Sequence, residues 1–516
     1  RKVTGDITGN IDLNQIDMTR VKRIEVLNGA ASSLYGSDAI GGVINIITNE
    51  PKDVVAFSSN SSYTRKNQFS QGLNLDIAQG KIGSYTSYKY DHSDGWQNSR
   101  LTEDGEDIIE TIAPLSLGYS SNNFSQKFTY DATDQLSFYA NGGYYNRGLE
   151  RPVEREDITG GSKYNTAYEG YNWGAGAKYK LSKRNVIQFD YSGNNYASRY
   201  KYLIENSGYL PGQYALTKLQ KFHDAELKGI FGFTTNSTTV FGADYRCEVL
   251  RRPDSDLDKS VYTTSAYGQH EVKLWNHLTG VVGVRYDHHE QTGGRFTPKV
   301  AAMYNIGNFN VRATYAAGFR APGIDELYYH MFKKTMGTRA TISLGDENLD
   351  PEHSNYYSIN MEYRTNRFSA SVTGYLNYVK NMVTSKSTKF DDLPEAEQNQ
   401  LREEFPEIGD LSSTKNLSVK NYFNFEKATV KGFEVNLNGN LFPGFTLAGN
   451  YTYAYGRGLN EGGEWQNIER SIRHTATITG NYTHSWSDYT LNLNLNGRLQ
   501  SKVYYCLLYT SDAADE

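Results

Sequence analysis

One histidine in the sequence stands among aromatic residues in a way that suits binding of an iron-containing ring. His330 follows Tyr328 and Tyr329 and precedes Met331 and Phe332. An imidazole nitrogen is a common axial ligand of haem iron, and aromatic side chains can cover a porphyrin face. The sequence therefore makes His330, Tyr328 and Tyr329 candidate haem contacts. The alternative interpretation is a loop histidine without a ligand.

Two other groups of side chains have metal-binding chemistry. Further candidate iron ligands are three histidines, His288, His289 and His353. A one-residue spacing that suits calcium occurs in an acidic run, Asp254, Asp256 and Asp258. A solvated acidic loop explains this run more simply, and calcium binding stays the alternative.

The motifs of common enzyme classes are missing. No GxSxG, HExxH, CxxC or phosphate-binding glycine loop occurs in a supporting context. The two cysteines, Cys247 and Cys506, are far apart and lack metal-binding spacing, although a disulfide between them stays open. We therefore expect that the protein is not an enzyme.

The composition is unusual for a soluble chain of this length. The 516 residues include 42 Tyr and 48 Gly but only 11 Pro, and 38% are hydrophobic. No long apolar run predicts a transmembrane helix. A transmembrane β-barrel needs apolar residues only at alternate positions, because its lumen face is polar. The net charge of -5 gives no general attraction to nucleic acid or anionic lipid.

Alternation of apolar and polar residues is the main pattern from about residue 53 onward. Leu491, Leu493 and Leu495 share one face of a segment, and the residues between them are asparagines. The same alternation runs from Phe368 to Tyr378. A period of two with one polar face predicts strands that have a lumen side and a lipid side.

Short turns and mostly longer connections separate these segments. Short turns are predicted near residues 79–82, 132–135, 182–185, 232–236, 274–277, 305–308, 364–367, 440–444 and 484–487. Longer connections are predicted near residues 93–121, 148–170, 196–219, 249–260, 319–352, 384–420 and 457–469. This arrangement predicts about 19 antiparallel strands of a membrane barrel. A soluble β-propeller would repeat a blade motif every 40–50 residues or so, and we find no such repeat.

The first 51 residues differ from the rest and form a small α/β unit, with strands expected over 21–29 and 41–48. The run VKRIEVLNGAASSLYGSDAIGGVINIITNEP, residues 21–51, closely resembles the end of the plug domain of TonB-dependent receptors. It departs from the family pattern at Ala30, where proline is usual. The matching residues interpreted as plug packing are Arg23, Glu25, Gly29, Tyr35, Gly36, Gly41, Gly42 and Asn45.

A second resemblance surrounds His330. Phe319-Arg320-Ala321-Pro322, followed by Asn348-Leu349, resembles the two motifs that bracket one extracellular loop in this family. Asp346-Glu347 depart from the usual Asn-Pro of the second motif. In haem receptors of the family a histidine lies between the two motifs, as His330 does here. The turn pattern independently places this connection on the long-loop side.

The resemblance implies an all-β fold: a transmembrane antiparallel β-barrel of the 22-stranded type with the C-terminal part of an α/β plug, in the outer membrane of a Gram-negative bacterium. Residues 1–51 are expected to be the end of the plug. Residues 52–505 are expected to be an incomplete barrel with a gap of about three strands. Residues 506–516 leave the strand pattern and are expected to be a non-native tail.

The resemblance also implies a function. Outer loops would capture a scarce nutrient, haem or another iron complex, and the TonB–ExbB–ExbD complex would drive its import. Haem would be cargo, and no cofactor is expected. Further expected partners are outer-membrane lipid, the small-molecule nutrient and a surface lipoprotein, but not nucleic acid. A cobalamin receptor of the same family is the alternative. A passive porin or barrel adhesin is the alternative from another class, and the plug residues argue against it.

Overall fold

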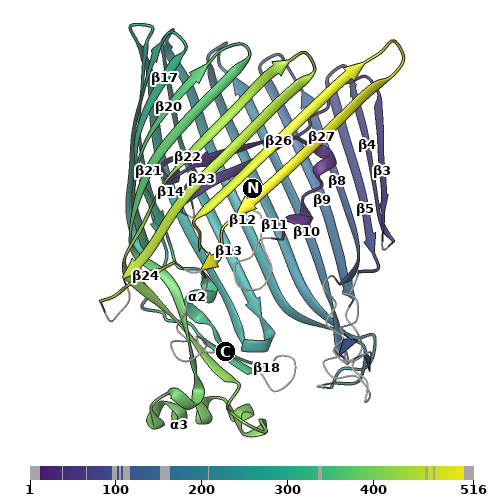
Figure 1. The fold of residues 1–516 in the computed structure, drawn as a ribbon, viewed down its shortest axis with the longest axis vertical. Helices are drawn as coiled ribbons and strands as arrows, with labels where there is room; N and C mark the ends of the chain where they lie inside the picture. Colours follow the sequence, from purple (N-terminus) through teal and green to yellow (C-terminus); the bar gives the residue numbers. More distant parts are fainter. Residues whose placement is uncertain are drawn as a thin grey trace.

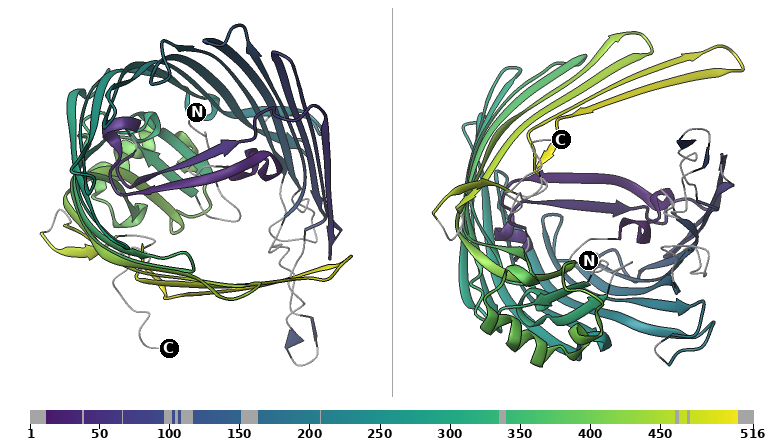
Figure 2. Two further views of the ribbon diagram at one scale, coloured as in Figure 1. Left: turned by 90° about the horizontal axis from the view of Figure 1, so that it is seen from above. Right: turned by 60° about the horizontal axis from the view of Figure 1, so that its bottom comes forward.

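The computed structural model shows a large β-barrel with a small strand–helix–strand unit inside it (Figures 1 and 2). It describes residues 12–37, 39–65, 67–95, 102–103, 106–107, 117–150, 163–206, 208–334, 340–459, 463–468 and 471–504. The tail predicted at residues 506–516, which includes Cys506, lies outside this part of the chain.

The barrel wall in the described part of the chain contains 19 strands of nine or more residues, as the sequence predicted. Successive members of this set pair antiparallel from the first to the last. The prediction of an all-β antiparallel barrel is confirmed. The strands are β3 (Ala56–Thr64), β4 (Gln68–Gln79), β5 (Ile82–Ser93), β8 (Gly118–Asp131), β9 (Leu136–Glu150), β10 (Tyr164–Lys180), β11 (Asn185–Tyr202), β12 (Tyr214–Thr234), β13 (Ser237–Arg252), β14 (Leu257–Leu274), β15 (Leu278–His289), β16 (Gly293–Ile306), β17 (Phe309–Arg320), β20 (Glu352–Arg364), β21 (Phe368–Lys389), β22 (Leu417–Phe442), β23 (Phe445–Leu459), β26 (His474–Ser485) and β27 (Thr490–Gln500).

The remaining elements are short. The strands among them are β1 (Val21–Asn28), β2 (Gly42–Thr48), β6 (Thr102–Glu103), β7 (Glu106–Asp107), β18 (His330–Lys334), β19 (Ala340–Leu344), β24 (Trp465–Asn467), β25 (Ser471–Ile472) and β28 (Val503–Tyr504). The helices are α1 (Ser32–Tyr35), α2 (Ile324–Tyr328) and α3 (Glu395–Glu404), with 3-10 turns η2 (Leu13–Gln15), η3 (Met18–Arg20), η4 (Pro253–Ser255), η5 (Phe390–Asp392) and η6 (Pro406–Asp410). No helix in the described residues is long and apolar enough to cross a membrane.

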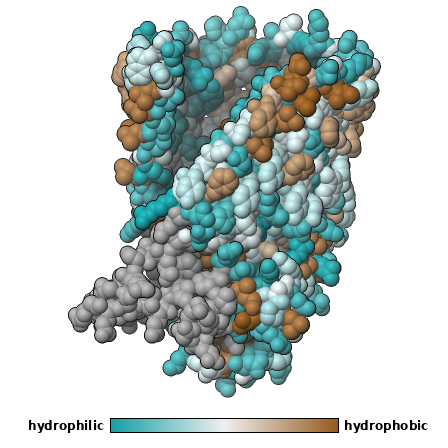
Figure 3. Space-filling model, turned by 90° about the vertical axis from the view of Figure 1, so that its right-hand side faces the viewer, coloured by the Kyte–Doolittle hydropathy of each residue, from teal (hydrophilic) through white to brown (hydrophobic). Residues whose placement is uncertain are grey.

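The two faces of the wall follow the predicted alternation. Glu434 on β22 accepts a hydrogen bond from Asn28 of the internal unit at 2.9 Å, so its side chain faces the lumen. The next residue, Val435, therefore faces outward, and its cross-strand neighbour Val372 is 48% exposed. Hydrophobic side chains gather on the upper part of the outer surface in Figure 3. This is the surface that a bilayer would cover.

The nine predicted short turns each connect two paired strands. They lie at the top of Figure 1, and the longer connections with α2 and α3 lie at the bottom. We call these the short-turn end and the long-connection end. Glycine provides the left-handed backbone at several tight turns, including Gly80 with φ +61° and Gly444 with φ +83°.

Two of the connections predicted as loops contain an α-helix, and the prediction of a simple loop was wrong there. Residues 319–352 include helix α2 and the hairpin β18–β19, and β19 pairs parallel with β22. Residues 384–420 include α3. Apolar side chains of the two connections pack together in one core, which stabilises this helix. That core consists of Ala340, Ile342, Phe390, Leu401, Phe405, Ile408, Leu417 and Val419. Neither connection carries a simple period, so burial between them was not visible in the sequence.

Several strands are much longer than a bilayer requires. β21 has 22 residues and β22 has 26. A tilted transmembrane strand needs about ten residues, so β22 is more than twice as long as required. At about 3.3 Å per residue it would span about 85 Å. The long-connection end therefore carries walls of paired strand that extend beyond the membrane region.

The barrel order closes by placing β27 next to β3. Every residue of β27 and eight of the nine residues of β3 are exposed. The sequence predicted an incomplete barrel with a gap of about three strands, whereas the strand order of the structure closes at this exposed seam.

Arginine on the outward face should destabilise the barrel more than arginine on the lumen face. We expect Val372→Arg to lower the free energy of unfolding by about 2–4 kcal/mol, because its charge enters the lipid. Ser371→Arg is the matched control, since Ser371 pairs with Glu362 on the lumen side. Urea titration of the barrel in lipid vesicles measures both variants. Equal losses would contradict this assignment of the two faces.

Candidate functional site

The internal unit is an antiparallel pair, β1 and β2, joined through α1. Figure 2 shows this purple pair crossing the barrel interior. Gly29, which directly follows β1, has φ +81°, and a Cβ there would overlap the Tyr356 ring of β20. Ala30 and Tyr356 belong to one buried cluster with Ala316. The unit therefore sits against the wall so closely that position 29 requires glycine.

Two serines tie the α1 region to the segment that carries the predicted Phe-Arg-Ala-Pro motif. Ser32 accepts a hydrogen bond from the Phe319 amide at 3.3 Å. Ser37 accepts one from the Ala321 amide at 3.2 Å. These donors lie where β17 leaves the wall, so the hydroxyls satisfy amides that a strand ladder would otherwise pair. The internal unit and the long-connection end thus share direct bonds.

The opposite side of the lumen also holds the unit. Asp12 accepts hydrogen bonds from the hydroxyls of Tyr145, at 2.9 Å, and Tyr196, at 3.2 Å. Lys127 donates to Glu50 at 3.0 Å. The unit therefore spans the lumen between strands on both sides.

The other residues predicted as plug packing have varied surroundings. Arg23 and Asn45 both donate to Glu25, at 2.7 and 3.2 Å, on an exposed face of the hairpin. Tyr35 is 41% exposed. The resemblance predicts that these side chains pack. In the structure Arg23, Glu25 and Asn45 form a polar network instead, and Tyr35 is exposed.

The glycines also differ from one another. A Cβ on Gly36 would lie 2.8 Å from an Arg285 nitrogen of β15, which is a close approach to the wall. A Cβ on Gly42 would meet the Leu27 carbonyl of the partner strand β1, whereas one on Gly41 would meet nothing within 4 Å. Wall packing thus explains Gly36 but not Gly41 or Gly42.

A buried ionic group beneath α1 was missed by the sequence analysis. Arg285 donates to Asp244 at 2.7 Å and to Asp287 at 2.8 Å, and its side chain is 2% exposed. Ser265 also donates to Asp287. The spacing of Arg285 and Asp287 could have revealed that they share a face, but the pairing with Asp244 depends on strand register.

Arg320 of the first motif links helix α2 to the segment that follows the second motif. Its guanidinium bonds Glu326 of α2 at 2.8 Å and Glu352 at 2.6 Å, next to the end of the second motif. Leu349 is buried with Leu327 and Val383. Pro322 is buried too, and Asn348 donates its amide to Asp346 at 2.8 Å. The ion pairs of Arg320 and the burial of Leu349 therefore hold the two ends of this connection together.

The three candidate haem contacts point to three different neighbours. Tyr329 is buried and accepts a hydrogen bond from Arg252 at 2.9 Å. Tyr328 lies under the Lys259 ammonium, 4.9 Å from the ring centroid. Burial raises the pKa of Tyr329 to about 12, so its hydroxyl stays protonated at neutral pH. Because Tyr329 is buried, its ring is not accessible to a ligand that reaches His330.

His330 itself remains accessible, with 53% of its side chain exposed. Its ring stacks on Phe405, with centroids 4.5 Å apart, and its Nε2 lies 3.3 Å from a Glu404 carboxylate oxygen. The hydrogen bond from Gln400, and to a smaller extent the one from His330, lowers the pKa of Glu404. Both neighbours come from the α3 connection, which sequence reasoning did not link to His330.

The remaining metal candidates are dispersed. His288 is exposed on the outer face and His289 is buried. The His353 ring stacks on the Phe319 ring, with centroids 6.3 Å apart. Asp254 is bonded by Arg252, at 2.7 and 3.1 Å, and Asp258 lies 3.7 Å from Arg251. Within the described ranges, no group of three or more potential ligands is positioned to hold a metal ion.

Family models match nearly the whole chain. The model described as TonB dependent receptor-like, beta-barrel covers residues 28–515, and that of the TonB-dependent receptor plug domain covers residues 2–43. The chain belongs to the TonB-dependent receptor family. The prediction of the family is confirmed, and with it the outer-membrane location of a Gram-negative bacterium.

Curated relatives of this TonB-dependent receptor are transporters and receptors rather than enzymes. The vitamin B12 transporter BtuB of Vibrio cholerae is 24% identical over 395 residues, covering 74% of this chain and 58% of that protein. The ferric enterobactin receptor PirA of Pseudomonas aeruginosa is 24% identical over 560 residues, covering 96% of this chain and 69% of PirA. The chain thus spans less than two thirds of the length of the BtuB relative.

Solved structures of TonB-dependent receptors share this fold. The siderophore receptor PirA of Pseudomonas aeruginosa has a TM-score of 0.65 at 18% identity, covering 93% of this chain and 79% of that one. The FrpB iron transporter of Neisseria meningitidis has a TM-score of 0.70 at 13% identity, covering 94% and 76%.

The requirement for glycine at position 29, next to the Tyr356 ring, can be tested in the intact receptor. Gly29→Ala should destabilise the internal unit by more than about 1 kcal/mol, because alanine disfavours this φ and its Cβ overlaps Tyr356. Hydrogen exchange of residues 21–48 measures the loss.

Gly41→Ala is the matched control for this experiment, since a Cβ there meets nothing. Adding Tyr356→Ala to Gly29→Ala should recover the steric part of the loss. If Gly29→Ala and Gly41→Ala accelerate exchange equally, Gly29 does not have the role assigned here.

Proposed function

We propose that this receptor binds a scarce metal-containing nutrient at its long-connection end and imports it through the barrel. The observation that carries the proposal is the internal unit, which spans the lumen and bonds the Phe319–Ala321 backbone at the long-connection end. A ligand that shifts this segment would act on the same hydrogen bonds that hold the unit. Residues 1–51 act as the end of the plug and residues 52–505 as the barrel in this proposal.

The energy for import comes from the TonB–ExbB–ExbD complex, acting on the plug. A porin or an adhesin needs no such unit in its lumen, so these alternatives lack support from the fold. A surface lipoprotein is a further proposed partner, which would deliver ligand to the long connections.

Uptake by cells that carry the intact receptor tests the proposal. Labelled haem, cobalamin and ferric enterobactin are supplied singly, with and without a functional TonB. We expect accumulation of one of them to fall to background without TonB, because plug displacement requires energy. Equal uptake of all three in both strains would indicate a passive pore and contradict the proposal.

The finer proposal concerns the ligand, and it is haem bound in part by His330. Its support is the accessible imidazole on the long-connection end, beside the aromatic ring of Phe405. Imidazole ligates haem iron. Phe405 is buried and stacks on the His330 ring, so it supports the imidazole from beneath. Haem binding would exchange the contact with Glu404 for a bond to iron. The names of the relatives make cobalamin and ferric siderophores the competing ligands.

A haem titration of the purified receptor, followed by absorbance, tests this assignment. Wild type should show a shifted Soret band, and His330→Ala should lose most of the shift because the axial ligand is removed. His288→Ala is the matched control, as His288 is exposed on the outer face. Tight cobalamin or siderophore binding without a Soret shift would overturn the haem proposal. Equal haem binding by His330→Ala would remove His330 alone from it.

A further inference from the structure

A hollow lies on the outer surface of the barrel, where lipid would meet the wall. It has a volume of about 880 Å³ and runs across β16, β17, β20, β21, β22 and β23. This volume lies in the range of ligand pockets, roughly 300–1,000 Å³. Small residues, Ala302, Ala313 and Gly374, leave the space. A Cβ on Gly374 would meet nothing within 4 Å, so this glycine opens the wall surface rather than packing against a neighbour.

Strand alternation shows that the hollow faces away from the lumen. Tyr356 packs on Ala30 of the internal unit, so the adjacent Tyr357 points outward. Glu434 bonds Asn28 inside, so the adjacent Phe433 also points outward. Tyr357 and Phe433 are 46% and 41% exposed. The hollow is therefore separate from the import path.

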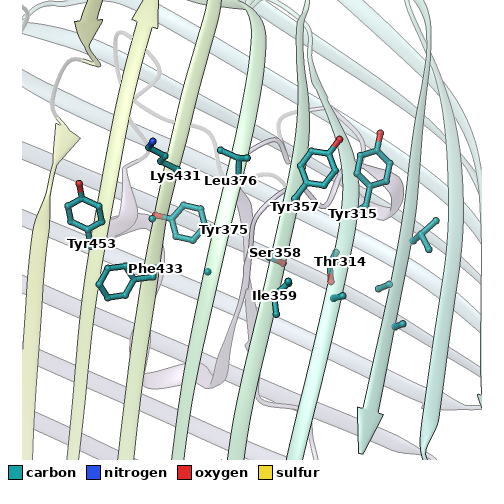
Figure 4. Close-up of a pocket in the computed structure, with 16 residues that line it drawn as sticks. Thr314, Tyr315, Tyr357, Ser358, Ile359, Tyr375, Leu376, Lys431, Phe433 and Tyr453 are labelled. Carbon is teal, nitrogen blue, oxygen red and sulfur yellow. The ribbon is translucent and has the colours of Figure 1, made fainter.

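The lining changes in character along the strands. Ile359, Gly374, Phe433 and Tyr453 are aligned in one row of cross-strand partners. The next outward row towards the long-connection end consists of Tyr357, Leu376, Lys431 and Tyr455. In Figure 4 the Lys431 ammonium and the hydroxyls of Tyr315 and Tyr357 point to the same end of the hollow. The hollow thus has an apolar floor and a polar, cationic end.

More cations follow beyond Lys431. Outward rows further towards the long-connection end contain Arg457, Lys427 and Lys380. Arg457 also donates to the Trp465 carbonyl, and Lys427 has an interaction within the protein. Lys431 and Lys380 are exposed.

No carboxylate balances these cations on the same face. The outward positions of β20, β21, β22 and β23 across these rows, within residues 353–363, 370–380, 427–437 and 449–459, contain no Asp or Glu. Asp350 in the preceding connection accepts a hydrogen bond from Asn381 at 3.4 Å. The whole chain has a net charge of -5, so the positive charge on this face is a local feature and does not reflect the overall composition.

We propose that this hollow binds one anionic lipid, with an acyl chain on the apolar floor and a phosphate-bearing head group at Lys431. Charge complementarity selects this occupant, because a bilayer supplies acyl chains along the wall and phosphates at its boundary. Tyrosine hydroxyls suit that boundary, where an amphipathic ring has one apolar and one polar surrounding. Lys380 lies further along the head-group side and strengthens the attraction.

Native mass spectrometry of the intact receptor in mixed phosphatidylglycerol and phosphatidylcholine nanodiscs tests the proposal. Wild type should retain phosphatidylglycerol in preference to phosphatidylcholine. Lys431→Gln should weaken that preference about fivefold, and Lys431→Gln with Lys380→Gln should weaken it further, since one lysine near an anionic surface contributes about this factor. Gly374→Leu should displace lipid of both kinds by filling the hollow, and its backbone tolerates a side chain.

Lys221→Gln is the matched control, because Lys221 is exposed on the outward face of β12, far from the hollow along the strand order. It should leave the preference unchanged. The proposal is overturned if Lys221→Gln and Lys431→Gln have equal effects, or if Gly374→Leu retains as much lipid as wild type. A shift of wild type to a dimer that Gly374→Leu abolishes, with no lipid preference, would assign the hollow to a second copy and would also overturn it.

Discussion

Backbone hydrogen bonding in a medium without water is the constraint on which this structure depends. Each amide and carbonyl within a bilayer must be satisfied by the protein, and a closed sheet achieves this by pairing every strand with two neighbours. Once the sheet is closed, each strand has one face towards lipid and one towards the lumen. The alternating sequence, the polar lumen and the buried contacts of the internal unit all follow from that division.

The alternation and the turns made most of the wall predictable. The strands from β3 to β27 and the nine short turns follow from a period of two and from local turn residues. The folded connections were not predictable in this way. The core that α3 shares with β19 joins residues about 60 apart, such as Ile342 and Leu401, and no local period reports such packing.

The candidate site was predictable only in part, for the same reason. The alternation of short turns and long connections is sufficient to place His330 on the long-connection end. It does not predict that Glu404 and Phe405 contact the imidazole, or that Tyr329 turns towards Arg252. Those contacts depend on how separate connections fold together. The Phe319–Pro322 motif is recognisable in the sequence, but the ion pairs of Arg320 with Glu326 and Glu352 depend on how the connection folds.

The length of β21 and β22 has a kinetic consequence. Paired strands of 22 and 26 residues form a hydrogen-bonded wall along one side of the space in front of the lumen, and the connections with α2 and α3 lie at the same end, so this space is a vestibule. A small molecule that dissociates inside such a vestibule collides with the wall many times before it diffuses away, so it often returns to the same surface. The vestibule therefore raises the local concentration of whatever enters it, and a modest intrinsic affinity can give a long residence time.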